Sequence, residues 1–364
     1  MELTGQDTRS SIAVTPPSSS IALPDWRRAW GAPPLRVTLR RHPQDFRVDE
    51  ELGFEPDGEG EHRFLRIEKV NANTAWVAGQ LARFAGIDVR HVGYSGLKDR
   101  HALTRQWFSV QLPLRSSVDW TGLCVEGVRV LEVSANRRKL RRGVHRSNRF
   151  RIVLRDVRGE TAPAAARLAR ISEDGVPNYF GEQRFGRDAS NLALAEALMR
   201  GRRLPRARRS LALSAARAWL FNHVLDRRVG DDSWRTLRAG DCAGLDGSGS
   251  VFAVERPDAE LDRRAAARDV HPTGPLWGRG ALSTSGEIEA LERDVARQFA
   301  AFADGLARHG LEQQRRPLRV AVRDLAWQAD GDVLELSFRL TRGAFATVVL
   351  RELADYRDAA PPPP

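Results

Sequence analysis

A short segment in the first third of the chain combines side chains that are suited to chemistry. Residues 93–106 read GYSGLKDRHALTRQ and lie between two apolar segments. Polar turns held by regular elements on both sides are where functional residues concentrate. We take Asp99 as the candidate nucleophile, because a neighbouring cation such as Lys98 favours the ionised carboxylate that nucleophilic or general-base chemistry needs. From residue types alone, an aspartate that caps a helix or closes a turn is the simpler alternative, and it stays open at this point.

The sequence lacks the signatures of other common catalytic sites. It contains no metal-ligand cluster, phosphate-binding loop, dinucleotide fingerprint or serine-centred nucleophile elbow. Its one notable cluster of carboxylates, Asp49-Glu50-Glu51, falls in the acidic and glycine-rich residues 49–61, which we predict to be an exposed loop. A lone aspartate beside a cation is therefore the main chemical candidate.

The charge of the chain favours a polyanionic partner. Its formal net charge is +11 and its pI is about 10.8, which points first to nucleic acid and second to an anionic membrane. Residues 137–151 contain eight Lys or Arg and no acid, and residues 200–209 contain six Arg and no acid. Such runs are often solvated surface loops, but like charges at this density repel one another unless an anion neutralises them. We expect the first run to bind RNA phosphates through Arg137, Arg138, Lys139, Arg141, Arg142 and Arg146.

Lysine is rare in this sequence. Of the 58 basic residues only Lys69, Lys98 and Lys139 are lysine. Arg and Lys differ in shape and in the pKa range they cover, so a site can require one rather than the other. We expect a specific role for Lys98 beside Asp99, whereas the other two lysines have no evident role.

Length and composition indicate a protein of two domains. The chain has 364 residues, 41% of them hydrophobic, which is enough for a sizeable core. It has no run of 18 apolar residues and no basic segment before an apolar one at its start, so we expect neither a membrane span nor a secretory signal. The two cysteines, Cys124 and Cys242, lie far apart without metal-ligand spacing. This usage fits a reducing cytosol, and we expect a cytoplasmic protein.

Hydrophobic periodicity predicts an α+β fold around the candidate nucleophile. Residues 1–24 are rich in Ser, Thr and Pro, and we interpret them as a disordered leader. Alternating apolar residues predict strands within residues 35–48 and 64–67, followed by a helix that ends near Gly86. A further strand is predicted over residues 107–112, directly after the polar turn. This order differs from a regular βαβ array.

The rest of the chain mixes helices with further strands. Its residues 175–186 interleave aromatic residues with polar ones and glycines, and they form either a packed turn between domains or a direct RNA contact. The predicted elements are helices over residues 161–174, 190–200, 210–229, 287–307 and 348–356, sheet over residues 319–348, and a Gly- and Pro-rich loop region with short strands over residues 240–286.

Several motifs, in order along the chain, resemble those of the TruD family of pseudouridine synthases, which act on uridine 13 of tRNA. Residues 96–106, GLKDRHALTRQ, are similar to the family signature, and residues 177–186, PNYFGEQRFG, match a second motif in full. Residues 43–50, PQDFRVDE, resemble an N-terminal motif, and residues 343–353 resemble a C-terminal one. Residues 147–150, SNRF, resemble Gly-Asn-x-Phe with serine in place of glycine. The combination makes the resemblance specific over most of the chain.

The resemblance implies an active site and a mechanism. Asp99 would be the nucleophile, attacking either C1′ of the ribose or C6 of the pyrimidine, and the uracil would be detached, turned and rejoined through C5 without an external cofactor or a metal. Phe150 would stack on the target base, Asn148 and Phe46 would line the pocket, and Phe345 would close it. Since a phenylalanine has no phenol, the C5 proton must leave to another acceptor.

A cation should pair with the nucleophile in such a site. Arg40, Arg41 and Lys98 are the candidates, and alignment with the family favours Arg40, which leaves Lys98 to contact backbone or phosphate. We therefore place both Arg40 and Lys98 among the substrate-binding residues.

The resemblance also implies the architecture. We expect an α+β fold in which the catalytic domain is a mixed, largely antiparallel β-sheet flanked by helices, with an inserted family-specific α/β domain. The catalytic domain would comprise residues 25–174 plus 323–356, and the insertion residues 175–322. Residues 357–364 would form a tail, of which we expect the last four, residues 361–364, to be frayed. The partner would be tRNA, lying in a positively charged cleft between the domains of a monomer.

Two other classes of function remain open at the level of sequence. The chain could be a non-catalytic RNA-binding or RNA-folding protein on the same scaffold, although its intact Asp99 and aromatic residues argue against this. It could also be an aspartate-dependent hydrolase of a smaller anionic substrate, which the lack of a second carboxylate or metal set makes a poor candidate.

Overall fold

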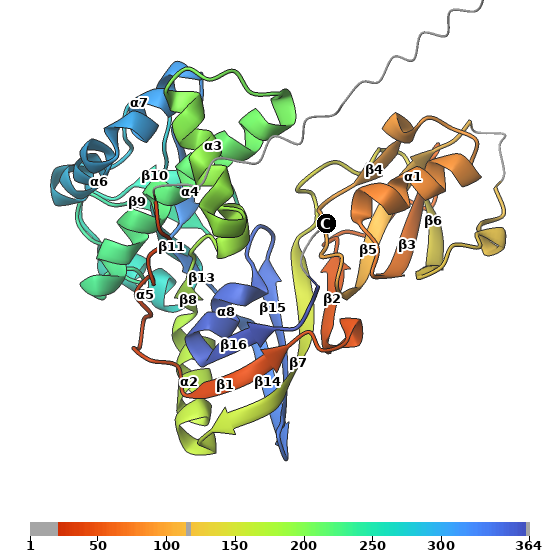
Figure 1. Cartoon of the computed structure of the whole chain (residues 1–364), viewed down its shortest axis with the longest axis horizontal. Helices are drawn as coiled ribbons and strands as arrows, with labels where there is room; N and C mark the ends of the chain where they lie inside the picture. Colours follow the sequence, from red (N-terminus) through yellow and green to blue (C-terminus); the bar gives the residue numbers. More distant parts are fainter. Residues whose placement is uncertain (1–20, 114–117, 362–364) are drawn as a thin grey trace, which may run out of the picture.

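The protein folds into two lobes, one built on a large β-sheet and one built mainly from helices (Figure 1). The computed structural model describes residues 21–113 and 118–361, so most of the leader expected over residues 1–24 lies outside the described residues. Helices and strands alternate irregularly along the chain, which confirms the predicted α+β class. The helices are α1 (Thr74–Phe84), α2 (Thr161–Asp174), α3 (Ser190–Met199), α4 (Arg206–Gly230), α5 (Ala259–Ala266), α6 (Gly286–Gln298), α7 (Ala300–Arg308) and α8 (Ala346–Leu353).

The sheet of the first lobe is mixed and largely antiparallel, as predicted. Its strands follow the order β14-β15-β7-β2-β5-β3-β6, while β1 pairs with β16 and with the far end of β7, and β4 pairs with β5. Only β2 with β5 and β1 with β16 are parallel among the pairs within this described sheet. Its strands are β1 (Leu35–Leu39), β2 (Phe46–Glu51), β3 (His62–Val70), β4 (Val92–Tyr94), β5 (Leu103–Gln111), β6 (Val128–Asn136), β7 (Ser147–Gly159), β14 (Arg323–Asp330), β15 (Val333–Thr341) and β16 (Ala354–Asp358).

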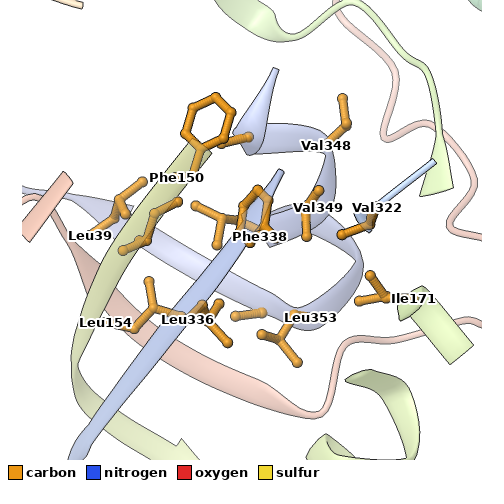
Figure 2. Close-up of a cluster of buried hydrophobic side chains, with 14 of the residues drawn as sticks. Leu39, Phe150, Leu154, Ile171, Val322, Leu336, Phe338, Val348, Val349 and Leu353 are labelled. Atoms are coloured by element: carbon orange, nitrogen blue, oxygen red, sulfur yellow. The ribbon is translucent and has the colours of Figure 1, made fainter. Parts of the chain in front are cut away.

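One core of this lobe lies between the sheet and helices α2 and α8. Figure 2 shows Phe150 and Leu154 of β7 beside Leu336 and Phe338 of β15, with Leu353 of α8 packed on them. The side chains alternate along β7, so its apolar residues enter the core while the arginines between them face outward. Full burial of each large apolar side chain is worth about 1.5–3 kcal/mol. The core therefore holds β7, which carries two of the predicted site residues, in a fixed register.

A second core supports the other half of the sheet. Leu65 and Ile67 of β3 are fully buried against Val77 and Leu81 of α1. Helix α1 also packs on β4 and β5. The polar turn that contains Asp99 connects β4 to β5, so this core positions both of its ends.

The second lobe contains helices α3 to α7 and a small antiparallel sheet with the strand order β10-β9-β11-β12. Its core includes Trp219, and the N-terminal Trp26 packs on it with ring centroids 5.7 Å apart. The strands of this lobe and its connections are β8 (Val176–Pro177), β9 (Cys242–Leu245), β10 (Val251–Ala253), β11 (Val270–Leu276), β12 (Gln314–Pro317) and β13 (Arg319–Val320).

The chain enters the second lobe through β8 and leaves it through β13. These two strands pair with each other, with Val176 opposite Val320. Gly175, which ends α2, has a φ of 77°, and a Cβ at this position would collide with the carbonyl oxygen of Val320. Only glycine suits this close approach. The pairing supports the proposed division into a discontinuous catalytic domain and an insertion over residues 175–322.

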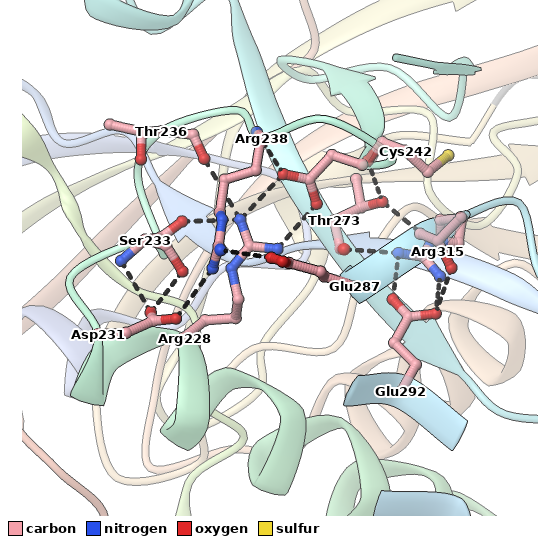
Figure 3. Close-up of polar contacts among 12 residues, drawn as sticks. Arg228, Asp231, Ser233, Thr236, Arg238, Cys242, Thr273, Glu287, Glu292 and Arg315 are labelled. Atoms are coloured by element: carbon pink, nitrogen blue, oxygen red, sulfur yellow. Dashed lines mark hydrogen bonds and ion pairs between the residues drawn. The ribbon is translucent and has the colours of Figure 1, made fainter. Parts of the chain in front are cut away.

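Buried ion pairs tie the elements of the second lobe together (Figure 3). Arg228 of α4 reaches Asp241, with Nη1–Oδ1 at 2.8 Å and Nη2–Oδ2 at 3.0 Å, and both side chains are almost completely buried. Arg315 of β12 pairs in the same way with Glu292 of α6, at 2.7 and 2.9 Å. Removing one partner of such a pair costs about 3–5 kcal/mol, because a buried charge is left without compensation.

The predicted exposed loop over residues 49–61 is wrong at its start. Strand β2 continues to Glu51, because Glu50 and Glu51 pair with the beginning of β7. The carboxylate of Glu50 is buried rather than exposed.

Three predictions in the second half of the chain were also wrong. The helix expected over residues 287–307 is interrupted at Phe299, whose φ of −120° and ψ of 44° are not helical. The region expected as loop and short strands over residues 240–286 also contains α5. The last helix ends at Leu353, because the next residues pair with β1 as strand β16. That strand runs to Asp358, the second residue of the predicted tail over residues 357–364.

Candidate active site

Buried polar side chains fix the turn between β4 and β5. The hydroxyl oxygen of Thr74, at the start of α1, accepts a hydrogen bond from the backbone N–H of Lys98 at 3.0 Å. The same hydroxyl donates to Oε1 of Gln106 at 2.8 Å, and Nε2 of Gln106 donates to the carbonyl of Gly96 at 3.3 Å. Thr74 and Gln106 are both buried. The turn is therefore anchored to a helix and a strand on either side of Asp99.

Lys69 binds the main chain of Asp99, and we did not predict this role from the sequence. Its ammonium donates to the backbone carbonyls of Ala72 at 2.7 Å and of Asp99 at 2.9 Å. The side chain is fully buried, and this burial lowers the pKa of Lys69 to about 8. A signal was available in the sequence, because Lys69 continues the inward alternation of Leu65 and Ile67 along β3.

Arg40 is the cation that pairs with Asp99. Its guanidinium donates to Oδ2 of Asp99, whose Oδ1 accepts the backbone N–H of His101 at 3.1 Å. Arg40 is also held by Asp358 of β16, with Nε–Oδ1 at 3.0 Å. The Arg40 side chain is 7% exposed, whereas that of Asp99 is 31% exposed. The carboxylate is thus oriented by a buried cation and still open to a substrate.

The backbone of Arg40 is strained. Its φ is 56°, in the left-handed region that a residue with a Cβ rarely adopts. Such conformations persist where surrounding contacts impose them, and they cluster at functional sites. Here the Arg40 guanidinium is held by its contacts with Asp99 and Asp358.

The other two candidate cations have different partners. Arg41 pairs with Asp156. The ammonium of Lys98 pairs with Glu50, whose other oxygen accepts the backbone N–H of Trp107 at 3.2 Å. Burial raises the pKa of the Glu50 carboxyl, and the nearby Lys98 opposes this effect. Lys98 therefore stabilises the turn from within, and a contact between Lys98 and substrate stays a prediction.

Aromatic rings lie next to the Arg40–Asp99 pair. The guanidinium of Arg40 lies over the ring of Phe46 at 5.5 Å. Phe46 meets Phe150 edge to face with ring centroids 6.2 Å apart, and Phe150 stacks on Phe338 at 5.4 Å. The fold thus brings Phe46 and Phe150, which are far apart in the sequence, to one side of the candidate nucleophile.

Asn148 is held by a relay of hydrogen bonds that starts in the turn. The hydroxyl of Ser95 is 2.6 Å from Nδ1 of His145, and Nε2 of His145 is 3.3 Å from Nδ2 of Asn148. The amide nitrogen of Asn148 donates to the ring, so its Oδ1 remains buried without a partner in the described chain. A buried acceptor without a partner is costly unless a ligand supplies the donor. Ser147, which replaces the family glycine, is the first residue of β7, an extended position that any residue adopts.

Phe345 lies at the beginning of α8 and is 42% exposed. Its loop is joined to the basic run, because Nη1 of Arg342 donates to the carbonyl of Gly143 at 2.6 Å. Strand β15, which leads into this loop, pairs with the start of β7, with Leu340 opposite Asn148. Phe345 is thus an accessible ring on the loop that follows the partner strand of Asn148, and its role in closing the pocket stays a prediction.

A family model described as tRNA pseudouridine synthase D (TruD) matches residues 28–203 and 193–353. The chain belongs to the TruD family. Curated relatives agree with this: tRNA pseudouridine synthase D of Methylococcus capsulatus is 48% identical over 335 residues, which cover 91% of this chain and 95% of the relative. The corresponding protein of Aeromonas hydrophila is 46% identical over 331 residues, which cover 90% and 94%.

A solved structure shows the same fold. The crystal structure of the putative tRNA pseudouridine synthase D from Methanosarcina mazei aligns with a TM-score of 0.67 and 20% sequence identity, covering 90% of this chain and 95% of that one. The TruD fold thus extends over both lobes, and the resemblance seen in the sequence motifs is confirmed.

The basic run of this TruD protein lies between β6 and β7 and beside the turn. Arg142 stacks on Tyr94 with its guanidinium 3.8 Å from the ring centroid. Arg137 pairs with Glu59, and the ammonium of Lys139 binds the carbonyl of Arg90. The exposed members that form no ion pair within the described residues are Arg138, Arg141, Arg142 and Arg146.

The aromatic stretch over residues 175–186 is buried. Tyr179, Phe180 and Phe185 are each at most 8% exposed and pack in the core of the second lobe. This favours the packed turn over the direct RNA contact. The second basic run, residues 200–209, continues into the first turn of α4.

The described residues contain no group of three or more His, Cys, Asp or Glu side chains that could hold a metal ion. No helix among them is both long enough and apolar enough to cross a membrane.

Proposed function

We propose that this protein converts uridine 13 of tRNA to pseudouridine with Asp99 as the nucleophile. As a member of the TruD family it is a pseudouridine synthase. The observation that supports the nucleophile is the Arg40–Asp99 pair, in which a buried guanidinium orients a carboxylate that remains accessible. A neighbouring cation favours an ionised carboxylate, which is the nucleophilic form.

The reaction is an isomerisation that needs no redox partner. Asp99 attacks C1′ of the ribose or C6 of the uracil and forms a covalent bond there, the bond between C1′ and N1 breaks, and the base turns before C1′ is joined to C5. The bond to Asp99 breaks when C5 attacks C1′, or, for the adduct at C6, by elimination after C1′ and C5 are joined, so the carboxylate is regenerated. The proton on C5 is then lost, and N1 ends with a proton. The proton lost from C5 is balanced by the proton gained at N1, so substrate and product are isomers.

The rest of the site suits an extruded pyrimidine. Phe46 lies beside Arg40 and meets Phe150 edge to face, and each ring is 6% exposed. Stacking on aromatic side chains is a usual way to hold a base that has left its helix. Our assignment of Phe150 to stacking therefore requires that RNA binding opens part of its ring surface. The unpartnered Oδ1 of Asn148 is a hydrogen-bond acceptor, and N3–H of uracil is a matching donor. We assign Asn148 to this contact and Phe345 to closing the pocket, while Lys98 holds the turn through Glu50.

The test is pseudouridine formation in an unmodified tRNA transcript that carries uridine at position 13. Wild type is expected to form pseudouridine there, whereas D99A and D99N are expected to lose at least about a thousandfold in kcat while binding tRNA comparably, as happens when a nucleophile is removed. The matched control is D156N, which breaks the neighbouring Asp–Arg pair with Arg41 and leaves the nucleophile intact.

The outcomes separate the candidate functions. An active D99A variant would show that another residue is the nucleophile. Wild type that binds tRNA without forming pseudouridine would support the non-catalytic RNA-binding alternative. D156N is expected to retain activity within about twofold, since isolated exposed ion pairs contribute about 0–1 kcal/mol.

A further inference from the structure

Two adjoining cavities lie beside the turn that contains Asp99, and Arg100 of that turn lines both of them. The first, of about 380 Å³, is lined by Arg40, Arg41, Arg100 and His101, together with the last described residues of the chain. The second, of about 650 Å³, is lined by Trp76 and Arg100 among others. Asn71 and Arg100 line both cavities, so the two form one continuous depression. We call it the flanking groove and define it by Arg40, Arg41, Asn71, Trp76, Arg100 and His101.

The flanking groove is continuous with the candidate active site. Arg40 contacts Asp99 and also lines the groove, and Arg100 and His101 follow Asp99 directly in the chain. A nucleotide whose base is held at Asp99 is covalently linked to neighbouring nucleotides of the RNA strand. Because the groove begins next to Asp99, it is placed to receive one of these neighbours. The mechanism described above uses none of Asn71, Trp76 or Arg100.

Two polar groups of the groove lack partners in the described structure, although Arg40 and Arg41 are paired. Arg100 makes no ion pair or side-chain hydrogen bond with the rest of the described chain, although arginines nearby are paired. Nε2 of His101 is shielded from solvent and has no hydrogen-bond partner in the described structure. An unpaired guanidinium and an unpaired ring nitrogen are groups that an anionic ligand with oxygen atoms can satisfy.

An exposed aromatic ring completes the groove. Trp76 lies in the first turn of α1 and is 46% exposed, while the opposite face of that helix packs in the core through Val77 and Leu81. The first cavity is lined by three arginines and no acid, and Glu126, the acid on the lining of the second cavity, is exposed. Cations that follow a backbone, combined with an aromatic ring on which a base can stack, are the pattern of single-stranded nucleic-acid sites.

We propose that the flanking groove holds the RNA strand next to the target uridine, with Arg100 paired to a phosphate and Trp76 stacked on an unpaired base. This inference rests on the proposed function. It assigns a binding role to residues outside the catalytic pocket, and it predicts that RNA affinity can be changed there without altering the chemical step.

The test measures KM and kcat for pseudouridine formation in the full-length protein. W76A is expected to raise KM about tenfold with kcat within about twofold, because stacking on an aromatic residue is worth about 1–3 kcal/mol per base. W76F keeps a ring and is expected to restore most of the affinity. The matched control is W327A, since Trp327 is 40% exposed but lies on β14, at the opposite edge of the sheet.

A second variant tests the phosphate contact independently of the ring. R100Q is expected to lower the slope of log Kd for tRNA against log salt by about 0.7–0.9, the value for one lost phosphate contact. This measurement does not depend on whether W76A folds, and melting temperatures identify a variant that does not.

Failure of this inference is distinguishable from failure of the proposed function. If wild type forms no pseudouridine, the proposed function is wrong. If wild type is active but W76A and W327A have equal KM and R100Q keeps the wild-type salt slope, the groove does not bind RNA and the inference is overturned, leaving another ligand such as a protein segment for it.

Discussion

The charged side chains around Asp99 work in pairs whose members come from distant parts of the chain. Arg40 is shared between Asp99 and Asp358, which is 318 positions further along the sequence. Lys98 is matched to the buried Glu50, and Lys69 binds the backbone carbonyl of Asp99. Each cation thus fixes one aspect of the nucleophile: its side-chain orientation, the turn that carries it, or its main chain.

The rarity of lysine has a structural explanation. Lys69 and Lys98 occupy positions where a single compact ammonium meets one or two oxygen atoms inside the protein. A guanidinium would bring five donors to the same place, more than the surrounding oxygen atoms could accept. From the sequence we expected a specific role for Lys98 beside Asp99 and saw no evident role for Lys69. The partners of Lys69 are backbone carbonyls, which a sequence does not reveal.

The first prediction at the scale of residues concerns His145, which holds the amide of Asn148. Burial, with the nearby cations Lys98 and Arg342, lowers the pKa of His145 from 6.5 to about 4. The unfolded chain therefore binds a proton near pH 6.5 that the folded protein does not accept until about pH 4. The contribution of this histidine to stability is fully present above pH 6.5 and is lost as the pH falls towards 4.

H145Q removes the titrating group and keeps a polar side chain. The free energy of unfolding of wild type is expected to fall by about 3 kcal/mol more than that of H145Q between pH 7 and pH 4. Chemical denaturation at each pH measures the difference, in which the other histidines cancel. Parallel curves for the two proteins would show that His145 titrates as it does in the unfolded chain.

At the scale of elements, local pattern predicted what local interactions determine. Helices α2 and α3 and the alternation of β15 follow from apolar spacing, and they were found close to the predicted positions. Of strand β16, residues 354–356 were predicted as helix and residues 357–358 as part of the tail. Its pairing with β1 joins segments from the two ends of the described chain, and local sequence patterns do not reveal such a contact. Glu50 was placed in a loop for the same reason, since its partner Lys98 is far away in the sequence.

The site shows the same division. Resemblance to the family singled out Arg40, Phe46, Asn148 and Phe150. In the fold, Arg40 pairs with Asp99, and Phe46 lies between Arg40 and Phe150. Asn148 belongs to the hydrogen-bond relay that starts at Ser95 of the same turn. Asp358 lies outside those motifs, and neither its residue type nor its spacing connects it to the site. Strand β16 therefore adds a functional residue through topology alone.

The second prediction concerns this strand. Asp358 holds Arg40 with hydrogen bonds between charged groups, and losing one of them is worth about 1.5–3 kcal/mol. D358N is expected to lower kcat about tenfold with a smaller effect on KM, because Arg40 then orients Asp99 less firmly. Single-turnover pseudouridine formation measures the effect.

The matched control for D358N is on the same strand. Asp355 makes an ion pair with Arg28, away from Asp99, with Nη2–Oδ1 at 3.0 Å. D355N removes the same charge from β16 and is expected to change kcat less than twofold. Equal losses in both variants would mean that β16 matters only for general stability.

At the scale of the whole molecule, exposed arginines gather in two runs, residues 137–151 beside the turn of Asp99 and residues 200–209 in the second lobe. The formal net charge is +11, but many arginines are neutralised by acids, such as Arg263 by Glu260 and Arg293 by Glu289. Arg138, Arg141, Arg142 and Arg146 of the basic run form no ion pair within the described residues. We infer that location, more than net charge, determines how this protein meets tRNA.

The last prediction tests that inference through the salt dependence of tRNA binding. Replacing Arg138, Arg141 and Arg142 with alanine is expected to lower the slope of log Kd against log salt by about 2–3, because each phosphate contact contributes about 0.7–0.9. The matched control replaces Arg263, Arg293 and Arg297 of the second lobe, which are paired with acids. This replacement lowers the net charge by the same amount. Its slope is expected to stay within about 0.5 of wild type, since only long-range attraction changes. Equal slopes for the two triple variants would mean that tRNA responds to the overall charge of the protein and that the basic run forms no local contacts with phosphates.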